Sequence, residues 1–208
     1  MRRWTRRRSA FANYDAPDSG FPVTENRERF FVLTGGPGSG KSTPIHALKQ
    51  AGFSTSIEAG RAIIQDQVNI GGTALPWNDR ALFAELMLSW EMRSFRIAEQ
   101  QTCPVFFDRG GPDVVGYLHL SKLPVPAHFL KAAEIFRYHG RVFIAPPWRE
   151  IFQQDRERKQ DFEEAVRTCE TLATTYRELN YELFELPRVS VAERVYFVLH
   201  RSGLALQS

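Results

Sequence analysis

The chain has 208 residues, 43% of them apolar, which suits one well-buried domain and is too short for two of ordinary size. Its formal net charge is +3, but the first eight residues include five arginines, so the rest of the chain is slightly acidic. A nucleic-acid reader would carry a basic stripe on a folded face. We therefore expect no specific nucleic-acid partner.

Residues 1–28 mix Arg, Asp, Pro and Gly without hydrophobic periodicity, which predicts a flexible basic N-terminal arm before a single domain over residues 29–208. The arm lacks the apolar stretch of a secretory signal, and no segment is long enough to span a membrane. Cys103 and Cys169 fit reduced thiols in a cytoplasmic protein, with a disulfide left as the alternative. Contact of the arm with a protein, RNA or an anionic membrane is a second open alternative.

Five short apolar runs alternate with longer segments of helical spacing from residue 29 onward. The runs are Phe30–Leu33, Phe53–Ile57, Val105–Phe107, Val142–Ala145 and Tyr181–Leu186. Strands that alternate with helices of this length predict an α/β fold in three layers, a five-stranded parallel sheet with helices on both faces.

Two of the intervening segments carry apolar residues every three or four positions. The first stripe consists of Leu82, Leu86, Trp90, Phe95 and Ile97. The second consists of Phe162, Ala165, Cys169, Leu172, Tyr176 and Leu179. We expect both stripes to face the core.

The first apolar run leads into Gly-Gly-Pro-Gly-Ser-Gly-Lys-Ser, a complete G-x-x-x-x-G-K-[ST] phosphate loop. The backbone N–H groups of such a loop point at a phosphate, Lys41 reaches the β/γ-phosphates, and Ser42 offers a hydroxyl to Mg²⁺. The loop predicts binding of ATP or GTP with Mg²⁺. The residues expected to hold the nucleotide are Gly35, Gly36, Pro37, Gly38, Ser39, Gly40, Lys41, Ser42 and Thr43.

Polar residues follow the second and third runs, where ligands of doubly wound folds bind. Glu58 is a candidate base for an acceptor hydroxyl, and its alternative role is a carboxylate at a helix N-terminus. Asp108 is a candidate Mg²⁺ ligand after the third run, against a plain strand-terminating aspartate. Arg109 would then face the transferred phosphoryl group or the acceptor.

The charged stretch 155–159 follows the fourth run. A charge run is usually a solvated helix face, but this position also suits a lid that closes over a triphosphate. We predict a lid near residues 149–161, with Arg156 or Arg158 as its arginine, and solvation of both side chains as the alternative.

The phosphoryl acceptor would lie between the segment after Glu58 and a helix that begins near Asp79. One or two of four side chains there are expected to touch it. The four are Arg61, Trp77, Phe83 and Tyr117. The five histidines have no ligand spacing, so we expect no metal cluster.

Four blocks resemble the small AAA-named P-loop proteins related to the ribosylnicotinamide kinase domain of the bacterial NAD regulator. The blocks are Gly35–Thr43, Glu58–Arg61, Phe107–Gly110 and Ala145–Phe162. Deoxynucleoside kinases are more distantly similar, although they prefer Ser where this chain has Gly110 and Pro where it has Ala59. The resemblance implies a nucleoside- or nucleotide-kinase-like P-loop NTPase fold over about residues 29–202, with Glu58 as base and with Asp108 and Arg109 at the phosphates.

The leading hypothesis is a Mg²⁺-dependent kinase that transfers the γ-phosphoryl of ATP or GTP to a hydroxyl or phosphate of a nucleoside-like small molecule. The alternative is a nucleotide-binding switch or regulatory NTPase that acts through a protein or lipid partner.

Overall fold

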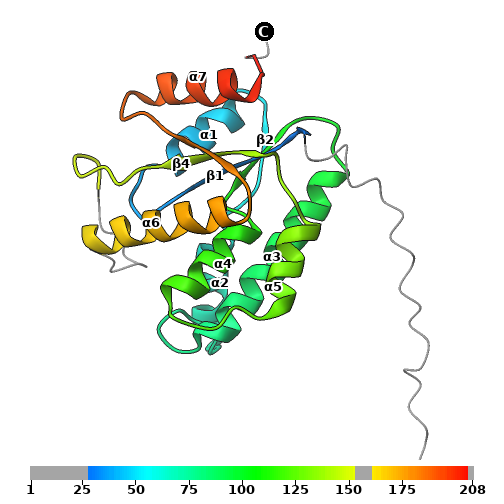
Figure 1. Cartoon of the computed structure of the whole chain (residues 1–208), viewed down its shortest axis with the longest axis vertical. Helices are drawn as coiled ribbons and strands as arrows, with labels where there is room; N and C mark the ends of the chain where they lie inside the picture. The colour runs from blue at the N-terminus through cyan, green and yellow to red at the C-terminus, as the bar shows by residue number, and fades with distance from the viewer. Residues whose placement is uncertain (1–27, 153–160, 206–208) are drawn as a thin grey trace, which may run out of the picture.

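A computed structural model describes residues 28–152 and 161–205 (Figure 1). Its five strands pair in parallel in the order β2-β3-β1-β4-β5. The strands are β1 Phe30–Gly35, β2 Ser54–Thr55, β3 Val105–Asp108, β4 Arg141–Ala145 and β5 Glu182–Glu185. The helices in these residues are α1 Ser42–Gln50, α2 Ala59–Ile70, α3 Arg80–Glu99, α4 Gly111–Leu120, α5 Ala127–Ile135, α6 Phe162–Glu178 and α7 Val191–Ser202.

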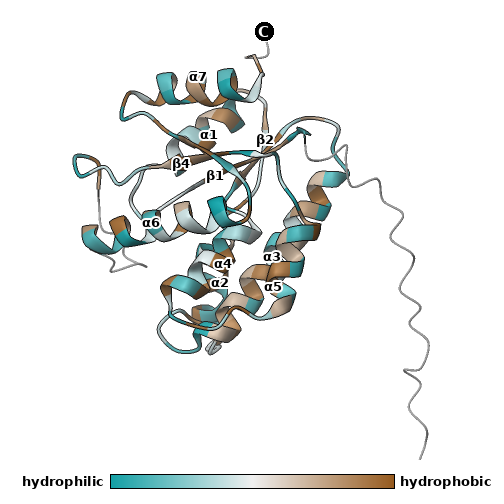
Figure 2. Cartoon of the chain, in the orientation of Figure 1, coloured by the Kyte–Doolittle hydropathy of each residue, from teal (hydrophilic) through white to brown (hydrophobic). Residues whose placement is uncertain are grey.

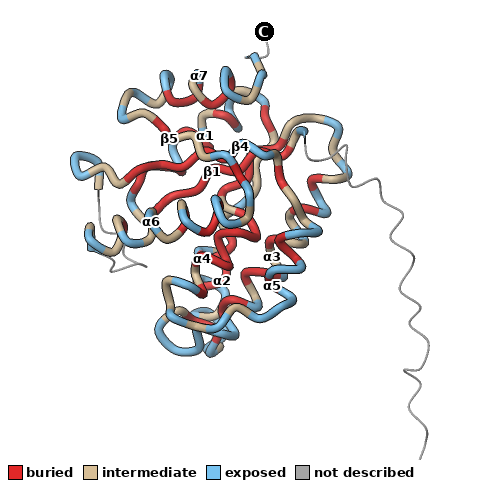
Figure 3. The backbone as a smooth tube through the Cα atoms, in the orientation of Figure 1, coloured by how far each residue is buried: buried red, intermediate tan, exposed pale blue. Residues whose placement is uncertain are grey.

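Helices cover both faces of the sheet, which confirms the predicted three-layer α/β architecture. Helices α1 and α7 pack together on one face, whereas α4 and α6 pack together on the other (Figure 1). Helices α2, α3 and α5 extend this second layer below the sheet (Figure 1). Strands β1, β3 and β4 are almost fully buried between the layers because apolar side chains fill both faces (Figure 3).

The first predicted helical stripe faces the core only in part. Phe95 is buried and Leu86 and Trp90 pack against the core, whereas Leu82 and Ile97 are 42% and 49% exposed. The fully buried residues of α3 include Phe95 and otherwise occupy neighbouring positions: they are Phe83, Ala84, Met87, Leu88, Glu91, Phe95 and Ala98. Apolar residues occur around most of this helix (Figure 2), and its buried face includes the carboxylate of Glu91, so the spacing of apolar residues located that face only in part. In α6 the buried members of the second stripe are Ala165, Leu172 and Tyr176, as expected.

The second strand is shorter than predicted. β2 forms only Ser54–Thr55 at the edge of the sheet, where it pairs with β3, and Ile57 beyond it is 69% exposed. This early end matters for the site, because α2 starts directly after Glu58, only three residues beyond β2.

Cys103 and Cys169 are both free thiols. Burial raises the pKa of the Cys169 thiol to about 11, with Glu185 and Glu170 contributing in the same direction. Within the described ranges, no helix combines the length and apolarity needed to cross a membrane.

Candidate nucleotide and acceptor site

The phosphate loop joins β1 to α1, as its sequence context predicted. A Cβ at Gly36 would lie 2.4 Å from the carbonyl oxygen of Ala165, so only glycine lets the loop approach α6 this closely. Gly40 has φ +74°, and a Cβ there would lie 2.6 Å from Cδ1 of Ile151. These glycines hold the loop in its curled form, and Lys41 follows as the N-cap residue of α1.

Arg194 of α7 supports the loop from behind, a contact that the sequence did not indicate. Its side chain is buried, donates a hydrogen bond from NH1 to the carbonyl of Gly40 at 3.1 Å, and lies 5.8 Å from the ring of Trp148. Burial lowers the pKa of this guanidinium from its ordinary value. Arg194 thus ties the loop to the segment after β4.

Lys41 and Asp108 meet at the ends of the neighbouring strands β1 and β3. Lys41 Nζ lies 3.6 Å from Asp108 Oδ1, and both side chains are less than 10% exposed. Asp108 Oδ1 has no hydrogen bond within the described residues. The backbone N–H of Asp108 donates to Ser56 Oγ at 2.9 Å, which fixes the end of β3.

Ser42 and Asp108 also line a cavity of about 220 Å³ beside the loop. A hydroxyl and a carboxylate are hard oxygen donors of the kind that Mg²⁺ prefers, and the unsatisfied Asp108 Oδ1 gives such an ion a ligand. The pair therefore fits the predicted magnesium site. No group of three or more His, Cys, Asp or Glu residues that could hold a metal occurs in the described residues.

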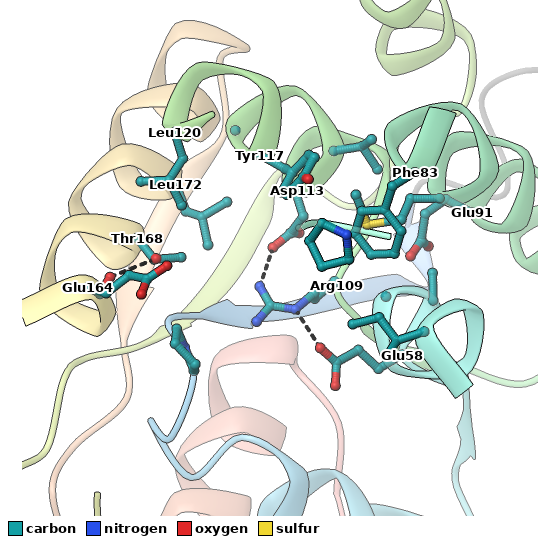
Figure 4. A pocket seen from close by; sticks show the side chains of 18 of the residues that line it. Glu58, Phe83, Glu91, Arg109, Asp113, Tyr117, Leu120, Glu164, Thr168 and Leu172 are labelled. Carbon is teal, nitrogen blue, oxygen red and sulfur yellow. Dashed lines mark hydrogen bonds and ion pairs between the residues drawn. The ribbon is translucent and has the colours of Figure 1, made fainter. Parts of the chain in front are cut away.

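Arg109 lies between two carboxylates (Figure 4). Its Nε donates to Glu58 Oε1 at 3.2 Å and its NH1 donates to Asp113 Oδ1 at 3.0 Å. Burial by itself would lower the pKa of Arg109, but Glu58, Asp113 and Asp108 together raise it above its usual range. The left-handed φ of +74° at Arg109 directs its side chain between these partners at the cost of backbone strain.

Asp113 anchors this arrangement and was missed by the sequence analysis. Its carboxylate also accepts hydrogen bonds from the hydroxyls of Thr34 and Tyr176 and from the backbone N–H of Gly110. Four donors thus satisfy a side chain that is only 6% exposed. Only its place in the first turn of α4, three residues after the N-cap Gly110, was readable from the sequence.

Glu58 is the N-cap residue of α2, but its carboxylate makes no capping hydrogen bond. It pairs with Arg109 and lies 3.9 Å from Arg61 Nε. Glu58 lines the small cavity with Ser42 and Asp108, and it also lines a second cavity of about 280 Å³. It is the one residue common to both walls within the described part of the chain.

The second cavity lies among α2, α3, α4 and α6 and has mostly apolar walls. Three of the four predicted acceptor contacts line it, namely Trp77, Phe83 and Tyr117, whereas Arg61 lines the smaller cavity. Phe83 and Tyr117 meet edge to face, with centroids 5.5 Å apart. Glu91 also lines this cavity and was missed because the sequence analysis considered only apolar members of its helix (Figure 4).

The predicted lid arginines Arg156 and Arg158 lie outside the described residues. Near the described ends of that segment, Phe152 packs edge to face on Phe162 with centroids 5.4 Å apart. Arg149 lies 4.2 Å from the centroid of the Phe162 ring. The start of α6 is therefore held to the segment after β4.

A phosphate loop beside an apolar cavity in a parallel sheet of this order defines a P-loop nucleotide-binding fold like that of nucleoside and nucleotide kinases. The model of the AAA domain family matches residues 30–194, and the chain belongs to this family. A comparison with curated protein sequences finds no match.

Solved structures share the fold at low sequence identity. The structure of the NadR protein in complex with NR is 16% identical, with a TM-score of 0.63. The match covers 86% of this chain and 53% of the NadR chain, so this chain spans about half the length of NadR. Thymidylate kinase from Ehrlichia chaffeensis is 13% identical with a TM-score of 0.59, covering 85% of this chain and 99% of its own. Deoxyadenosine kinase from M. mycoides, with products bound, is 13% identical with a TM-score of 0.51, covering 84% and 98%.

Proposed function

We propose that this protein is a Mg²⁺-dependent phosphotransferase that moves the γ-phosphoryl group of ATP or GTP to a nucleoside or nucleotide-like small molecule. The observation that carries the proposal is the position of Glu58. Its carboxylate lines both the cavity beside the phosphate loop and the apolar cavity among the helices. A base between donor and acceptor is what phosphoryl transfer to a hydroxyl needs.

In this proposal each residue has a role that follows from its position in the site. The loop amides and Lys41 bind the β- and γ-phosphates, while Ser42 and Asp108 hold Mg²⁺, which neutralises phosphate charge when bound. Glu58 takes the proton of the acceptor hydroxyl as the acceptor oxygen bonds to the γ-phosphorus. The bond from that phosphorus to the β–γ bridging oxygen breaks, and its electron pair leaves with the diphosphate.

Arg109 orients Glu58 and adds positive charge beside the transferred group. We further propose that Arg156 or Arg158, on a lid near residues 149–161, approaches the triphosphate and excludes water. The basic arm 1–28 stands apart from the reaction, and the domain over 29–208 works in the cytoplasm. The fold of the NadR, thymidylate kinase and deoxyadenosine kinase structures supports this class of reaction without naming the acceptor.

The test measures release of diphosphate from Mg·ATP and Mg·GTP by the full chain, with and without pooled nucleosides, nucleotides and nicotinamide riboside. A kinase should be strongly accelerated by one pool, and splitting that pool identifies the acceptor. Slow release that no pool accelerates would contradict the proposal and favour a nucleotide switch.

A further inference from the structure

Arg194 of α7 contacts the phosphate loop at the peptide group that joins Gly40 to Lys41. We infer that Arg194 is a positioning residue for nucleotide binding: by holding the Gly40 carbonyl, it directs the Lys41 N–H toward the phosphates. The inference rests on one part of the proposed function, namely that the loop binds a nucleoside triphosphate. It does not depend on which molecule accepts the phosphoryl group.

The orientation of this peptide group follows from its planarity. In a trans peptide the C=O and N–H groups point in opposite directions, and the described residues contain no cis peptide bond. Arg194 NH1 holds the Gly40 carbonyl at 3.1 Å, so the Lys41 N–H points away from Arg194. Lys41 has helical angles, φ −63° and ψ −42°, which direct its N–H along the axis of α1 and out of its N-terminal end. That end is where a phosphate binds in such a loop.

Pro44 explains why the Gly40 carbonyl needs a side chain as its donor. In an α-helix a carbonyl accepts from the N–H four residues later. The carbonyl of Lys41 does so, from the N–H of Ile45 at 3.2 Å. Pro44 stands four residues after Gly40 and has no N–H. Arg194 therefore supplies the donor that α1 lacks at this position.

Arg194 occupies this position at a cost to folding. The residue is 3% exposed, and its Nε has no hydrogen-bond partner in the described residues. Burial lowers the pKa of Arg194, and no carboxylate in the described part of the chain counteracts this effect. A buried guanidinium without a carboxylate partner is unfavourable for stability. Its charge is instead available to strengthen the hydrogen bond to the loop.

The surroundings of Arg194 keep it on Gly40. Its guanidinium lies 5.8 Å from the centroid of the Trp148 ring. A Cβ at Gly40 would lie 3.2 Å from Arg194 NH1 and 2.6 Å from Cδ1 of Ile151, so the two side chains enclose this glycine. The contact is part of the packing of α1 against α7 (Figure 1). Packing of this kind orients the loop in advance, which lowers the entropic cost of binding a phosphate.

The experiment measures the Kd of non-hydrolysable ATP and GTP analogues with Mg²⁺ by calorimetry on the full chain. Arg194→Met keeps an unbranched side chain over Trp148 but removes the charge and the donors. We expect its Kd to be at least about tenfold higher than that of wild type, because a hydrogen bond from a charged donor is lost. Arg194→Lys keeps a charged donor and should bind more tightly than Arg194→Met. Arg201→Met, at an exposed position of the same helix, is the matched control and should bind as wild type does.

Pro44→Ala tests the orientation of the peptide group. The alanine N–H can donate to the Gly40 carbonyl and so replace the donor that Arg194→Met removes. In the double variant we expect the Kd to return to within about threefold of wild type. If Pro44→Ala does not improve the affinity of Arg194→Met, the effect of Arg194 comes from its charge alone, and the inference is overturned.

The same titrations separate this inference from the proposed function. Failure of wild type to bind either analogue would contradict the proposed function itself. Equal Kd values for wild type and Arg194→Met would overturn only the role of Arg194.

Thermal melts without nucleotide give the readout for a purely structural role. We expect the Tm of Arg194→Met to lie within about 3 °C of wild type, because an unfavourable buried charge is removed together with the hydrogen bond. A lower Tm with an unchanged Kd would assign Arg194 to folding alone and overturn the inference.

Discussion

The phosphate loop and the acceptor cavity are adjacent but are built by different means. The loop is eight consecutive residues whose function depends on backbone N–H groups, three close-packed glycines and one lysine. The cavity takes side chains from α2, α3, α4 and α6, which are separated by long stretches of sequence. Under the proposed function, a binding mode common to all triphosphates resides in the backbone, and selection of the acceptor resides in side chains that can vary.

Glu58 lines both the small cavity beside the loop and the larger cavity, so its removal should have the largest effect. We expect Glu58→Gln to lower kcat by about 10²–10⁴-fold, because the amide cannot accept the hydroxyl proton, while the affinity for ATP changes little. Steady-state kinetics with a saturating acceptor measure this. Asp66→Asn, on the exposed part of α2, is the control. A normal kcat in Glu58→Gln would remove Glu58 from the role of base.

A substitution in the loop should weaken binding of the nucleotide and leave binding of the proposed acceptor unchanged. Lys41→Ala removes the ammonium beside Asp108 and leaves that buried carboxylate without its cation. We expect about a 10²–10³-fold loss of transition-state stabilisation together with weaker ATP binding in calorimetry. Lys49→Ala, an exposed residue of the same helix, should behave as wild type. Unchanged ATP affinity in Lys41→Ala would contradict the phosphate-loop assignment.

The hydrogen bonds that Asp113 accepts below the larger cavity can be tested by measuring the thermal stability of the protein. Asp113→Asn places an amide where Arg109, Tyr176 and the backbone of Gly110 all donate, so donors face donors. We expect a loss of about 3 kcal/mol, or roughly 6–12 °C in Tm, in calorimetric melts. Tyr176→Phe removes one of these donors and should cost about 1 kcal/mol. Equal Tm values for the two variants would show that Asp113 does not anchor the network.

The contrast between a contiguous loop and a cavity assembled from distant helices also explains which features could be predicted from the sequence. The loop, the strand ends at Asp108 and the parallel sheet were predictable because each is a contiguous pattern with a local cause. Their proximity followed from the rule that parallel strands place their carboxyl ends at one edge. The ion pair between Lys41 and Asp108 is the product of that rule.

The groups that were missed depend on tertiary structure alone. Glu91 is a carboxylate within the buried face of α3, and a search for apolar periodicity passes over a charged residue. Arg194 reaches the loop from 154 positions away. No local pattern marks such residues, because their environment comes from the packing of helices that are distant in the sequence.

The smallest expected effect is a pH dependence of stability that comes from Glu91. Its pKa is raised by burial, then by Asp113, Asp108 and Glu58, against the opposing effect of Arg109. The folded state therefore binds the proton more tightly than the unfolded state does. The stabilisation is fully present below about pH 4.5, the ordinary pKa of Glu91, and it is lost as the pH rises toward the pKa in the folded protein.

Glu91→Gln cannot ionise, so its stability relative to wild type should increase as the pH rises above about 4.5. Calorimetric melts of both proteins from pH 5 to 8.5 measure the difference in their stability. The contributions of the other carboxylates are the same in both proteins and cancel in this difference. Glu178→Gln, at an exposed position of α6, should leave the wild-type profile unchanged. Parallel profiles for wild type and Glu91→Gln would mean that Glu91 ionises normally in the fold. A widening difference would mean that this buried carboxyl lowers stability as the pH rises.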